Sequence, residues 1–227
     1  MTIKNKIAII TGASSGIGYV TAFTLSKAGA KVAIGARRTD RLKQLENEIK
    51  KCGGDVLSQK LDVTKKDECD TFVNQVIKKW GTIDILVNNA GIMPISLIEN
   101  LKVNEWEHMV DVNFRGVLYC TAAVLPYLKE KKSGHIVNVS STASKIVFPS
   151  GSIYCATKRA VTAFSEGLRQ ELGPGLNIRV TCIMPGTTET DLLNSITDES
   201  LKKMVGESIK NTQSLKPKDI ADAILFA

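Results

Sequence analysis

Residues 6–28 read KIAIITGASSGIGYVTAFTLSKA, and this stretch decides the fold. The run 6–10 is mostly apolar and rich in isoleucine, which predicts a buried strand, and 16–28 has the period of a helix. Between them lie Gly12, Gly16 and Gly18. Glycines let the turn tighten and let a pyrophosphate approach the backbone at the helix N-terminus, where free N–H groups and the helix dipole favour anions. Glycine-rich turns also arise for packing, but the position between a strand and a helix favours a phosphate site.

The alternation of strand and helix continues along the chain. The predicted strands are 6–10, 31–35, 55–60, 83–88, 134–140 and 177–183, and the predicted helices are 16–28, 39–51, 65–80, 102–130 and 152–172. Strands this apolar are covered on both faces, so the pattern predicts an α/β fold with a doubly wound parallel sheet. Ligands of such sheets bind at the carboxyl ends of the strands. We expect one domain over residues 1–227, a length that suits a single core.

Composition and charge argue against several classes of function. The net charge is +7, but the basic residues are scattered and form no stripe interleaved with aromatics, so no nucleic-acid partner is expected. The sequence shows neither a membrane-spanning run nor a secretory signal, so we expect a cytoplasmic protein without membrane contact. The five cysteines are odd in number and lack a Cys-x-x-Cys pair, and the two histidines stand apart, so neither a disulfide framework nor a metal site is expected. Cys155 has no histidine close in sequence, which disfavours a catalytic cysteine.

Polar residues follow the third and fourth predicted strands. Asp62 stands where a carboxylate can accept a hydrogen bond from an adenine amino group, and a plain turn aspartate is the alternative. Residues 88–91 read Asn-Asn-Ala-Gly, which suits a tight crossing where backbone and ligand come close. A simple Asn-Gly type of turn is the alternative reading of this second motif.

A tyrosine and a lysine stand four residues apart at Tyr154 and Lys158, with Ser141 thirteen positions before the tyrosine. Residues four apart project from one face of a helix, so the ammonium is expected beside the phenol, lowering its pKa toward the working pH. The first turn of the helix at 152–172 adds the positive end of the dipole. A phenol tuned in this way is a proton donor or acceptor. The spacing alone is weak evidence, but together with the glycine-rich loop and the upstream serine it is strong.

By these motifs the chain resembles the short-chain dehydrogenase/reductase family in its single-domain form. The resemblance covers nearly the whole chain and rests on Thr11–Gly18, Asp62-Val63, Asn88–Gly91, Asn113, Ser141, Tyr154 with Lys158, and Pro185-Gly186 followed by Thr190. It implies a Rossmann fold and NAD(P)-dependent hydride transfer at an alcohol or carbonyl carbon.

The resemblance also implies roles for individual residues. Tyr154 is the acid, Lys158 also holds the nicotinamide ribose hydroxyls, and Ser141 binds the substrate oxygen. Ser140 competes for the role of Ser141, but the thirteen-residue interval favours Ser141. Asn113 helps to hold a water for proton relay to Lys158, with a helix-kink amide as the alternative.

The choice of coenzyme is predicted at the end of the second strand, where the chain reads Gly35-Ala36-Arg37-Arg38. Relatives that prefer NAD usually carry an acid there, which would repel a 2′-phosphate. Guanidinium groups match phosphate geometry, so Arg37, with a contribution from Arg38, is expected to clamp the 2′-phosphate of NADP. The alternative is that both arginines face solvent. Ser15 stands where some NADP-linked relatives have a second basic residue, so a moderate preference over NAD is expected.

The connection from 186 to 215 is long enough for a lid, and Thr188 and Thr190 are expected to meet the nicotinamide carboxamide and the phosphates. Its apolar residues suggest either a substrate wall or docking onto the core: Leu192, Leu193, Ile196, Leu201, Met204 and Val205.

Relatives usually close the sheet with a seventh strand after a helix that begins here near Pro217, so we expect either a sheet of six strands or a chain that continues beyond Ala227. A homodimer or homotetramer is expected through the helices at 102–130 and 152–172.

The predicted function is an NADP-dependent oxidoreductase that interconverts a small-molecule carbonyl and an alcohol. The alternatives are an NAD-linked hydroxysteroid or sugar-alcohol dehydrogenase and a cofactor-binding regulator without turnover. The predicted catalytic residues are Asn113, Ser141, Tyr154 and Lys158, and the predicted coenzyme-binding residues are Gly12, Ser14, Ser15, Gly16, Ile17, Gly18, Arg37, Arg38, Asp62, Val63, Asn89, Ala90, Gly91, Tyr154, Lys158, Pro185, Gly186, Thr188 and Thr190.

Overall fold

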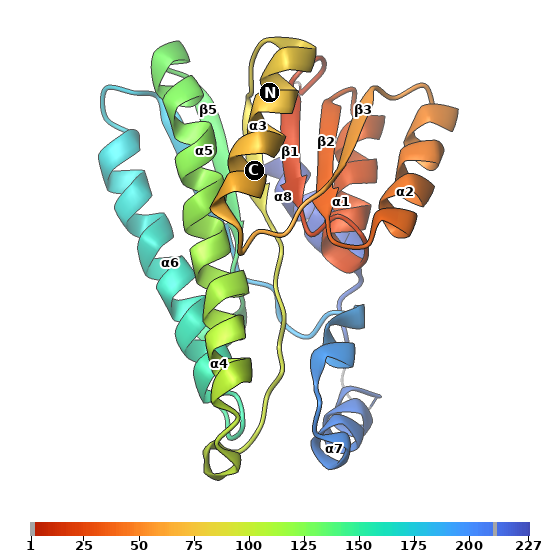
Figure 1. Cartoon of the computed structure of the whole chain (residues 1–227), viewed down its shortest axis with the longest axis vertical. Helices are drawn as coiled ribbons and strands as arrows, with labels where there is room; N and C mark the ends of the chain where they lie inside the picture. Colours follow the sequence, from red (N-terminus) through yellow and green to blue (C-terminus); the bar gives the residue numbers. More distant parts are fainter. Residues whose placement is uncertain (1–2, 211–212) are drawn as a thin grey trace.

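A computed structural model describes residues 3–210 and 213–227 and shows a six-stranded parallel sheet between two layers of helices (Figure 1). The strand order is β3-β2-β1-β4-β5-β6. The strands are β1 (Ile7–Thr11), β2 (Lys31–Ala36), β3 (Val56–Lys60), β4 (Ile85–Asn88), β5 (Gly134–Val139) and β6 (Ile178–Ile183). The predicted α/β fold with a doubly wound parallel sheet is confirmed, and each predicted strand lies within two residues of its observed bounds.

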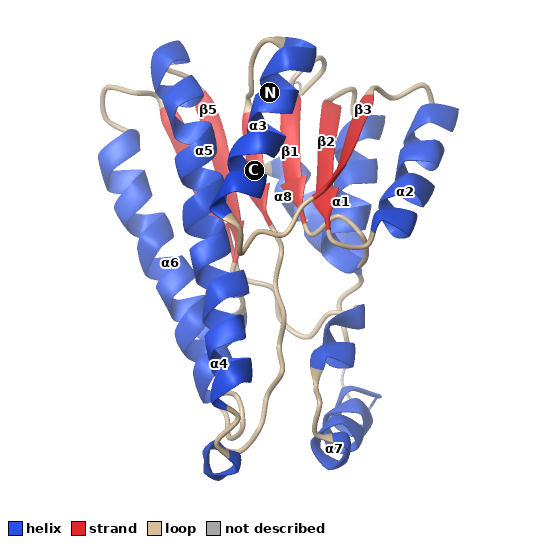
Figure 2. Cartoon of the chain, viewed as in Figure 1, coloured by secondary structure: helices blue, strands red, loops and turns tan. Residues whose placement is uncertain are grey.

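The helices alternate with the strands along the chain (Figure 2). They are α1 (Gly16–Lys27), α2 (Thr39–Lys51), α3 (Lys66–Trp80), α4 (Val103–Val110), α5 (Gly116–Lys131), α6 (Ser152–Leu172), α7 (Glu199–Lys210) and α8 (Pro217–Phe226). Short helical segments are η1 (Ile98–Asn100), η2 (Asp111–Arg115), η3 (Thr142–Ser144) and η4 (Asp191–Ser195). None of the helices in the described ranges has both the length and the apolarity needed to cross a bilayer.

Two apolar layers hold the sheet because alternate residues of each strand point to opposite faces. On one face, Ile9 and Leu86 pack with residues of α3, α5 and α6, among them the fully buried Phe72. On the other face, Ile10 and Val87 pack with residues of α1, α2 and α8. This two-sided covering explains why the strands are apolar without alternation.

Two predicted segments contain more structure than the sequence indicated. The helix expected over 102–130 is an uninterrupted helical run over 103–131, in which the π-helical segment η2 lies between α4 and α5, and Asn113 within η2 bonds Ile92 in the loop after β4. The connection 186–215 contains η4 and α7. Ile196, 2% exposed, and Leu201, 8% exposed, anchor this connection in a third apolar cluster with Ile95 and Tyr154.

Candidate active site

The carboxyl ends of the strands open on a cleft of about 1070 Å³. It extends from the loops after β1, β2 and β3 to the start of α6 and to the segment that carries η4 and α7. The strand order reverses between β1 and β4, the place where sheets of this kind bind their ligands. Of the predicted residues, Gly18 and Asn113 lie behind the surface of the cleft, and the structure brings all the others to its lining.

The glycine-rich loop packs directly on the loop after β4. Gly12 has φ of 67°, and a Cβ there would lie 2.7 Å from Ala90 Cα. A Cβ on Gly18 would lie 2.4 Å from Asn89 Nδ2, the atom that donates to the Thr11 carbonyl at 3.0 Å. Close approach between two loops therefore requires glycine at 12 and 18, so packing explains these two glycines in addition to any role toward a ligand.

The N-terminus of α1 faces the cleft through Ser15, Gly16 and Ile17. Ser15, the N-cap, is extended, and among the described residues no side chain caps the helix and no acid lies in its first turn. The backbone N–H groups and the positive end of the helix dipole are therefore turned toward the cleft. A phosphate group fits this cradle by charge and by donor type.

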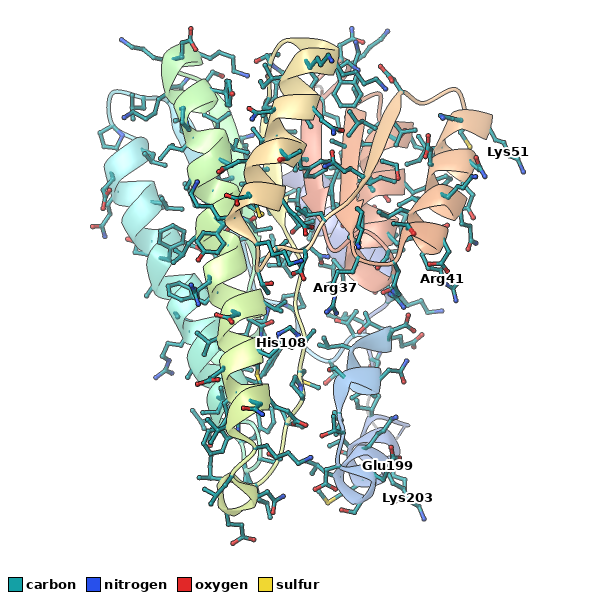
Figure 3. The ribbon with its side chains drawn as sticks, in the orientation of Figure 1. Arg37, Arg41, Lys51, His108, Glu199 and Lys203 are labelled. Atoms are coloured by element: carbon teal, nitrogen blue, oxygen red, sulfur yellow. The ribbon has the colours of Figure 1, made fainter. Side chains whose placement is uncertain are left out.

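The end of the cleft formed by the loops after β1 and β2 is basic. Arg38 donates from Nε to Ser14 Oγ at 3.2 Å and from its terminal nitrogen to Ser15 Oγ, and it lies 3.9 Å from the Asp191 carboxylate of η4. Arg37 lies exposed just beyond the carboxyl end of β2 (Figure 3). Both arginines line the cleft and both are exposed to solvent, and the half-exposed Arg38 also bonds the glycine-rich loop.

Asp62 lines the same basic end of the cleft and also stabilises the turn in which it lies. Its Oδ1 accepts from Thr64 Oγ1 at 2.8 Å and from Thr64 N at 3.1 Å. Burial acts to raise the Asp62 pKa, but the Thr64 hydrogen bonds and the Arg37 charge outweigh it and hold the pKa below its ordinary value. Asp62 is therefore a charged turn residue at the edge of the cleft, which fits both readings of the sequence.

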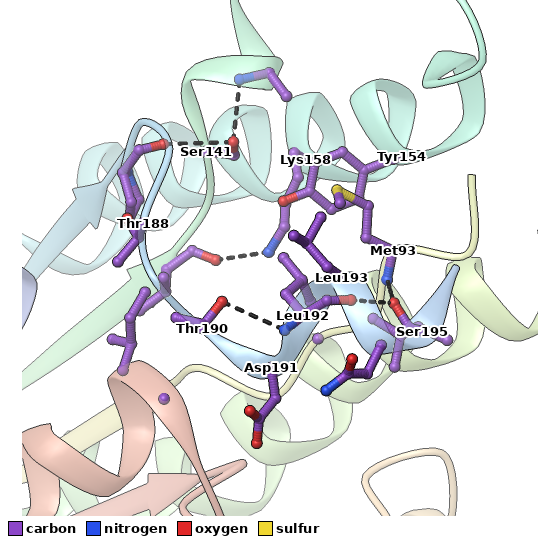
Figure 4. A pocket seen from close by; sticks show the side chains of 18 of the residues that line it. Met93, Ser141, Tyr154, Lys158, Thr188, Thr190, Asp191, Leu192, Leu193 and Ser195 are labelled. Atoms are coloured by element: carbon purple, nitrogen blue, oxygen red, sulfur yellow. Dashed lines mark hydrogen bonds between the residues drawn. The ribbon is translucent and has the colours of Figure 1, made fainter. Parts of the chain in front are cut away.

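Tyr154 and Lys158 project side by side from the start of α6 (Figure 4), each 6% exposed. Lys158 Nζ donates to the Val139 carbonyl at 3.0 Å and lies 5.8 Å from the centre of the Tyr154 ring. Burial lowers the pKa of Lys158 to about 8. An ideal Cβ on Gly91 would lie 3.6 Å from Lys158 Nζ, so the loop after β4 reaches the ammonium.

The expected lowering of the Tyr154 pKa is wrong for this structure. Burial raises the pKa of Tyr154 to about 12, and a hydrogen bond with Ser141 opposes this only in part. The tyrosine packs among apolar residues such as Ile95 and Ala143, and the ammonium is directed to a carbonyl instead of the phenol. Tyr154 is therefore a neutral phenol near pH 7, which is the form that donates a proton.

The structure separates the two candidate serines. Ser140 is 3% exposed, and its hydroxyl donates to the Lys158 carbonyl at 2.8 Å and contacts Thr162 Oγ1 at 2.9 Å. Ser141 caps η3 by accepting from Ala143 N at 3.1 Å and also faces the phenol of Tyr154. Ser141 is therefore the serine placed to share a ligand oxygen with Tyr154.

Asn113 is 1% exposed and binds the segment after β4. Its Oδ1 accepts from Ile92 N at 2.8 Å, and its Nδ2 donates to the Ile92 carbonyl at 2.9 Å and to Thr157 Oγ1 at 3.2 Å. The side chain therefore fixes the wall of the cleft and ties it to α6. Its role in proton relay stays a prediction.

The chain after β6 closes the cleft. The Pro185 carbonyl accepts from Thr142 N at 2.9 Å, and Thr188 Oγ1 donates to the Gly186 carbonyl at 3.0 Å. Thr190 caps η4 and approaches the glycine-rich loop, because a Cβ on Gly16 would lie 3.2 Å from Thr190 Cβ. Both ends of the site thus meet at this segment.

The structure adds lining residues that the sequence analysis missed. Met93, Ile95, Ala143, Ile146, Phe148 and Ser195 are among them. They belong to the loop after β4, the loop between Ser141 and Tyr154, and η4. Their only sequence signal is position, because loops at the carboxyl ends of parallel strands face the ligand. The apolar residues of 192–205 serve both expected purposes, since Ile196 docks on the core while Leu193 and Met204 line the cleft.

Comparison with known proteins agrees with this geometry. The family model described as short chain dehydrogenase matches residues 6–201. An uncharacterized oxidoreductase of Staphylococcus saprophyticus is 48% identical over 227 residues, covering 99% of this chain and 90% of the relative.

Two solved structures resemble the chain and differ in coenzyme. One is an alcohol dehydrogenase from the archaeon Thermococcus sibiricus complexed with 5-hydroxy-NADP, with a TM-score of 0.85, 32% identity, and coverage of 97% of this chain and 89% of that one. The other is a 3-ketoacyl-(acyl-carrier-protein) reductase from Brucella melitensis complexed with NADH, with a TM-score of 0.88, 34% identity, and coverage of 99% and 90%. From the motifs, the Rossmann-type sheet and these matches, the chain belongs to the short-chain dehydrogenase/reductase family of oxidoreductases.

Proposed function

We propose that this protein is an NADP-dependent oxidoreductase that interconverts a carbonyl compound and a primary or secondary alcohol, with Tyr154 as the acid and base. The observation that carries the proposal is the placement of Tyr154, Lys158 and Ser141 at one point of a cleft whose other end is a phosphate cradle with two arginines. When bound, a nicotinamide coenzyme supplies or accepts a hydride at the carbonyl carbon.

The residues of the chain supply the proton and the orientation. Ser141 and Tyr154 hold the carbonyl oxygen, and the phenol donates its proton to that oxygen as negative charge develops there. The raised pKa of about 12 supports this direction, because the phenol keeps its proton at neutral pH. Lys158 orients the ribose hydroxyls with its ammonium. Asn113 helps to hold a water for proton relay to Lys158 while its side chain fixes the wall of the cleft at Ile92.

The preference for NADP rests on the basic end of the cleft. Arg37 is exposed beside Asp62, and Arg38 is anchored on Ser14 and Ser15, so a 2′-phosphate at the end of β2 meets two guanidinium groups. Guanidinium to phosphate bonds are charge-assisted, whereas the ribose hydroxyl of NAD offers no charge to match. Asp62 remains at the adenine side of this end.

The test is coenzyme oxidation with a panel of ketones, aldehydes and 3-oxoacyl thioesters, and coenzyme reduction with hydroxy acids. We expect consumption of NADPH with at least one carbonyl, and a kcat/KM for NADPH above that for NADH by ~10-fold or more. Oxidation of NADH in preference to NADPH would contradict the coenzyme assignment. Binding of either coenzyme without turnover of any substrate would favour the regulator instead.

We also infer a cytoplasmic homodimer or homotetramer that associates through α5 and α6. The two long helices lie on one side of the molecule (Figure 1), and Phe114 of η2 meets Phe164 of α6 edge to face at 6.3 Å, which braces that side. The molar mass in solution from light scattering tests the assembly. A mass equal to one chain at assay concentration would contradict it.

A further inference from the structure

The cleft has two halves that differ in charge. The coenzyme half is formed by the loops after β1, β2 and β3, and the substrate half by the lining residues of 92–95, 143–150 and 192–209. The charged lining residues are Arg37, Arg38, Asp62, Lys158 and Asp191. Arg37, Arg38 and Asp62 belong to the coenzyme half, Asp191 at the start of η4 faces it at 3.9 Å from Arg38, and Lys158 stands at the boundary. Within the described part of the chain, the lining of the substrate half thus contains no charged side chain.

The charges of this region are placed on the outside. Helix α7 carries four charged residues in its described part between 199 and 207, yet the residues of α7 that line the cleft are uncharged: Leu201, Met204, Val205, Ser208 and Ile209. Glu199 is 84% exposed in its side chain, and Figure 3 shows Glu199 and Lys203 at the outer end of the molecule. The amphipathic pattern of α7 therefore directs an uncharged face toward the ligand.

The hydroxyl of Ser195, which lies in the same wall, is bonded to the protein. Ser195 Oγ accepts from Met93 N at 2.8 Å and donates to the Leu192 carbonyl at 2.6 Å. Outside the cleft lining, Thr197 Oγ1 accepts from Lys102 Nζ at 2.6 Å and donates to Glu105 Oε1 at 2.7 Å. These bonds join η4 to the loop after β4 and the segment after η4 to the start of α4, and they hold the wall in place. The polar side chains that line the substrate half, Ser150, Asn194, Ser195 and Ser208, are all uncharged.

Resting on the proposed function, we propose that the substrate is an uncharged, largely apolar carbonyl compound or the matching alcohol. The reacting oxygen lies at Ser141 and Tyr154, and the rest of the molecule lies between Phe148 and the apolar side of α7. A carboxylate on that part of the substrate would lose its hydration and find no counter-ion in the cleft. A chain of hydroxyls would lose its hydration and find too few hydrogen-bond partners. The substrate half therefore rejects carboxylates and sugar alcohols and accepts ketones, including keto esters, and aldehydes with apolar substituents.

The experiment compares two matched pairs of ketones, ethyl acetoacetate with acetoacetate and ethyl levulinate with levulinate. Each pair presents the same reacting ketone and differs in one negative charge. With the wild-type protein and saturating NADPH, we expect kcat/KM for the ester to exceed that for the acid by ~100-fold or more. Equal values, or a preference for the acids, would overturn the inference and leave the proposed function intact.

A variant places a cation in the wall. Met204 is 60% exposed, so Met204→Arg is compatible with folding, and it should reduce the ester to acid ratio by ~10-fold or more. Glu207→Gln is the matched control, because it adds the same net charge on α7 outside the cleft lining and should leave the ratio unchanged. An unchanged ratio in Met204→Arg, or an equal change in both variants, would overturn the inference. Failure of every ketone to be reduced while NADPH binds would instead refute the proposed function.

Discussion

The two halves of the cleft are built from the same sheet but are held by different forces. In the coenzyme half, backbone meets backbone: Gly12 packs on Ala90, and Asn89 bonds the carbonyls of Thr11 and Gly12. In the substrate half, apolar side chains such as Phe148 and Leu193 form the wall on long connections. The first half therefore depends on particular residue types at particular positions, whereas the second depends on bulk and the absence of charge. Substitutions in the two halves should affect different kinetic parameters.

The largest effect is expected at the boundary of the two halves, at Tyr154. Tyr154→Phe removes one proton donor and almost no volume, so kcat/KM should fall by ~100-fold or more while the dissociation constant for NADPH changes little. Steady-state kinetics and fluorescence titration of NADPH measure the two quantities. Activity retained within about tenfold would show that another group is the acid.

A smaller and more selective effect is expected in the coenzyme half. Arg37→Ala should lower kcat/KM for NADPH by ~10- to 100-fold and leave that for NADH nearly unchanged, because only NADPH carries the 2′-phosphate. Arg41→Ala is the matched control, since Arg41 lies on α2, the helix that follows Arg37, and is not among the residues that line the cleft (Figure 3). If Arg37→Ala lowered kcat/KM equally for NADPH and NADH, Arg37 would not be the residue that binds the 2′-phosphate. The same conclusion would follow if Arg41→Ala lowered kcat/KM for NADPH as much as Arg37→Ala does.

The pH dependence should reveal Lys158. Its pKa is about 8, so kcat/KM for reduction should decrease above pH 8 by about tenfold per pH unit as the ammonium loses its proton. Tyr154, with its pKa near 12, stays protonated over the same range. In Lys158→Arg, which keeps its charge, the decrease near pH 8 should disappear even where the rate is lower. A decrease at the same pH in both proteins would assign the titration to another group.

The same lowered pKa has a consequence for stability. Below pH 8 Lys158 is charged in both the folded and the unfolded chain, so burial of the charge fully opposes folding. Between pH 8 and the ordinary value of 10.5 the unfolded chain binds the extra proton, so the contribution of this residue to stability improves as the pH rises.

The smallest effect is expected in the substrate half. Ser195→Ala removes the bonds to Met93 N and the Leu192 carbonyl, so the wall loosens and KM for the carbonyl substrate should rise by about fivefold. The KM for NADPH should stay the same, which would sharpen the contrast between the halves. Ser200→Ala serves as the control, because its hydroxyl bonds Asp198 on the exposed side of the segment. Equal changes for coenzyme and substrate would mean that the halves are not independent.

Much of the fold was readable in the sequence because local patterns and tertiary packing agree. The apolar runs around Ile9 and Ile136 are buried on both sides, so periodicity and topology lead to the same sheet. The helix over 102–130 was predicted to within one residue at each end, but its π-helical segment was not, because the buried amide of Asn113 bonds a distant segment and such a contact leaves no periodic trace. For the connection 186–215, docking onto the core was one of the two expected roles of its apolar residues, and Ile196 and Leu201 do pack in the third apolar cluster.

For the site, the position of the residues after β1, β2 and β3 in the cleft was predictable and that of the residues opposite them was not. Glycine at position 12 is required by backbone geometry, so it appears as part of a motif. Residues such as Met93 and Phe148 carry ordinary apolar chemistry and become site residues only through the fold. The pKa of Tyr154 was also out of reach, because burial among apolar neighbours outweighs the nearby ammonium.

The most direct test of the account follows the hydrogen that is transferred. Purified protein is supplied with ethyl acetoacetate and with NADPH deuterated at either of the two hydrogens of nicotinamide C4, and the alcohol is analysed by mass spectrometry and NMR. The account predicts deuterium on the carbinol carbon from one of the two labelled coenzymes, and no labelled alcohol above background with Tyr154→Phe. An unlabelled alcohol from both coenzymes, or equal labelling by the Tyr154→Phe variant, would contradict it.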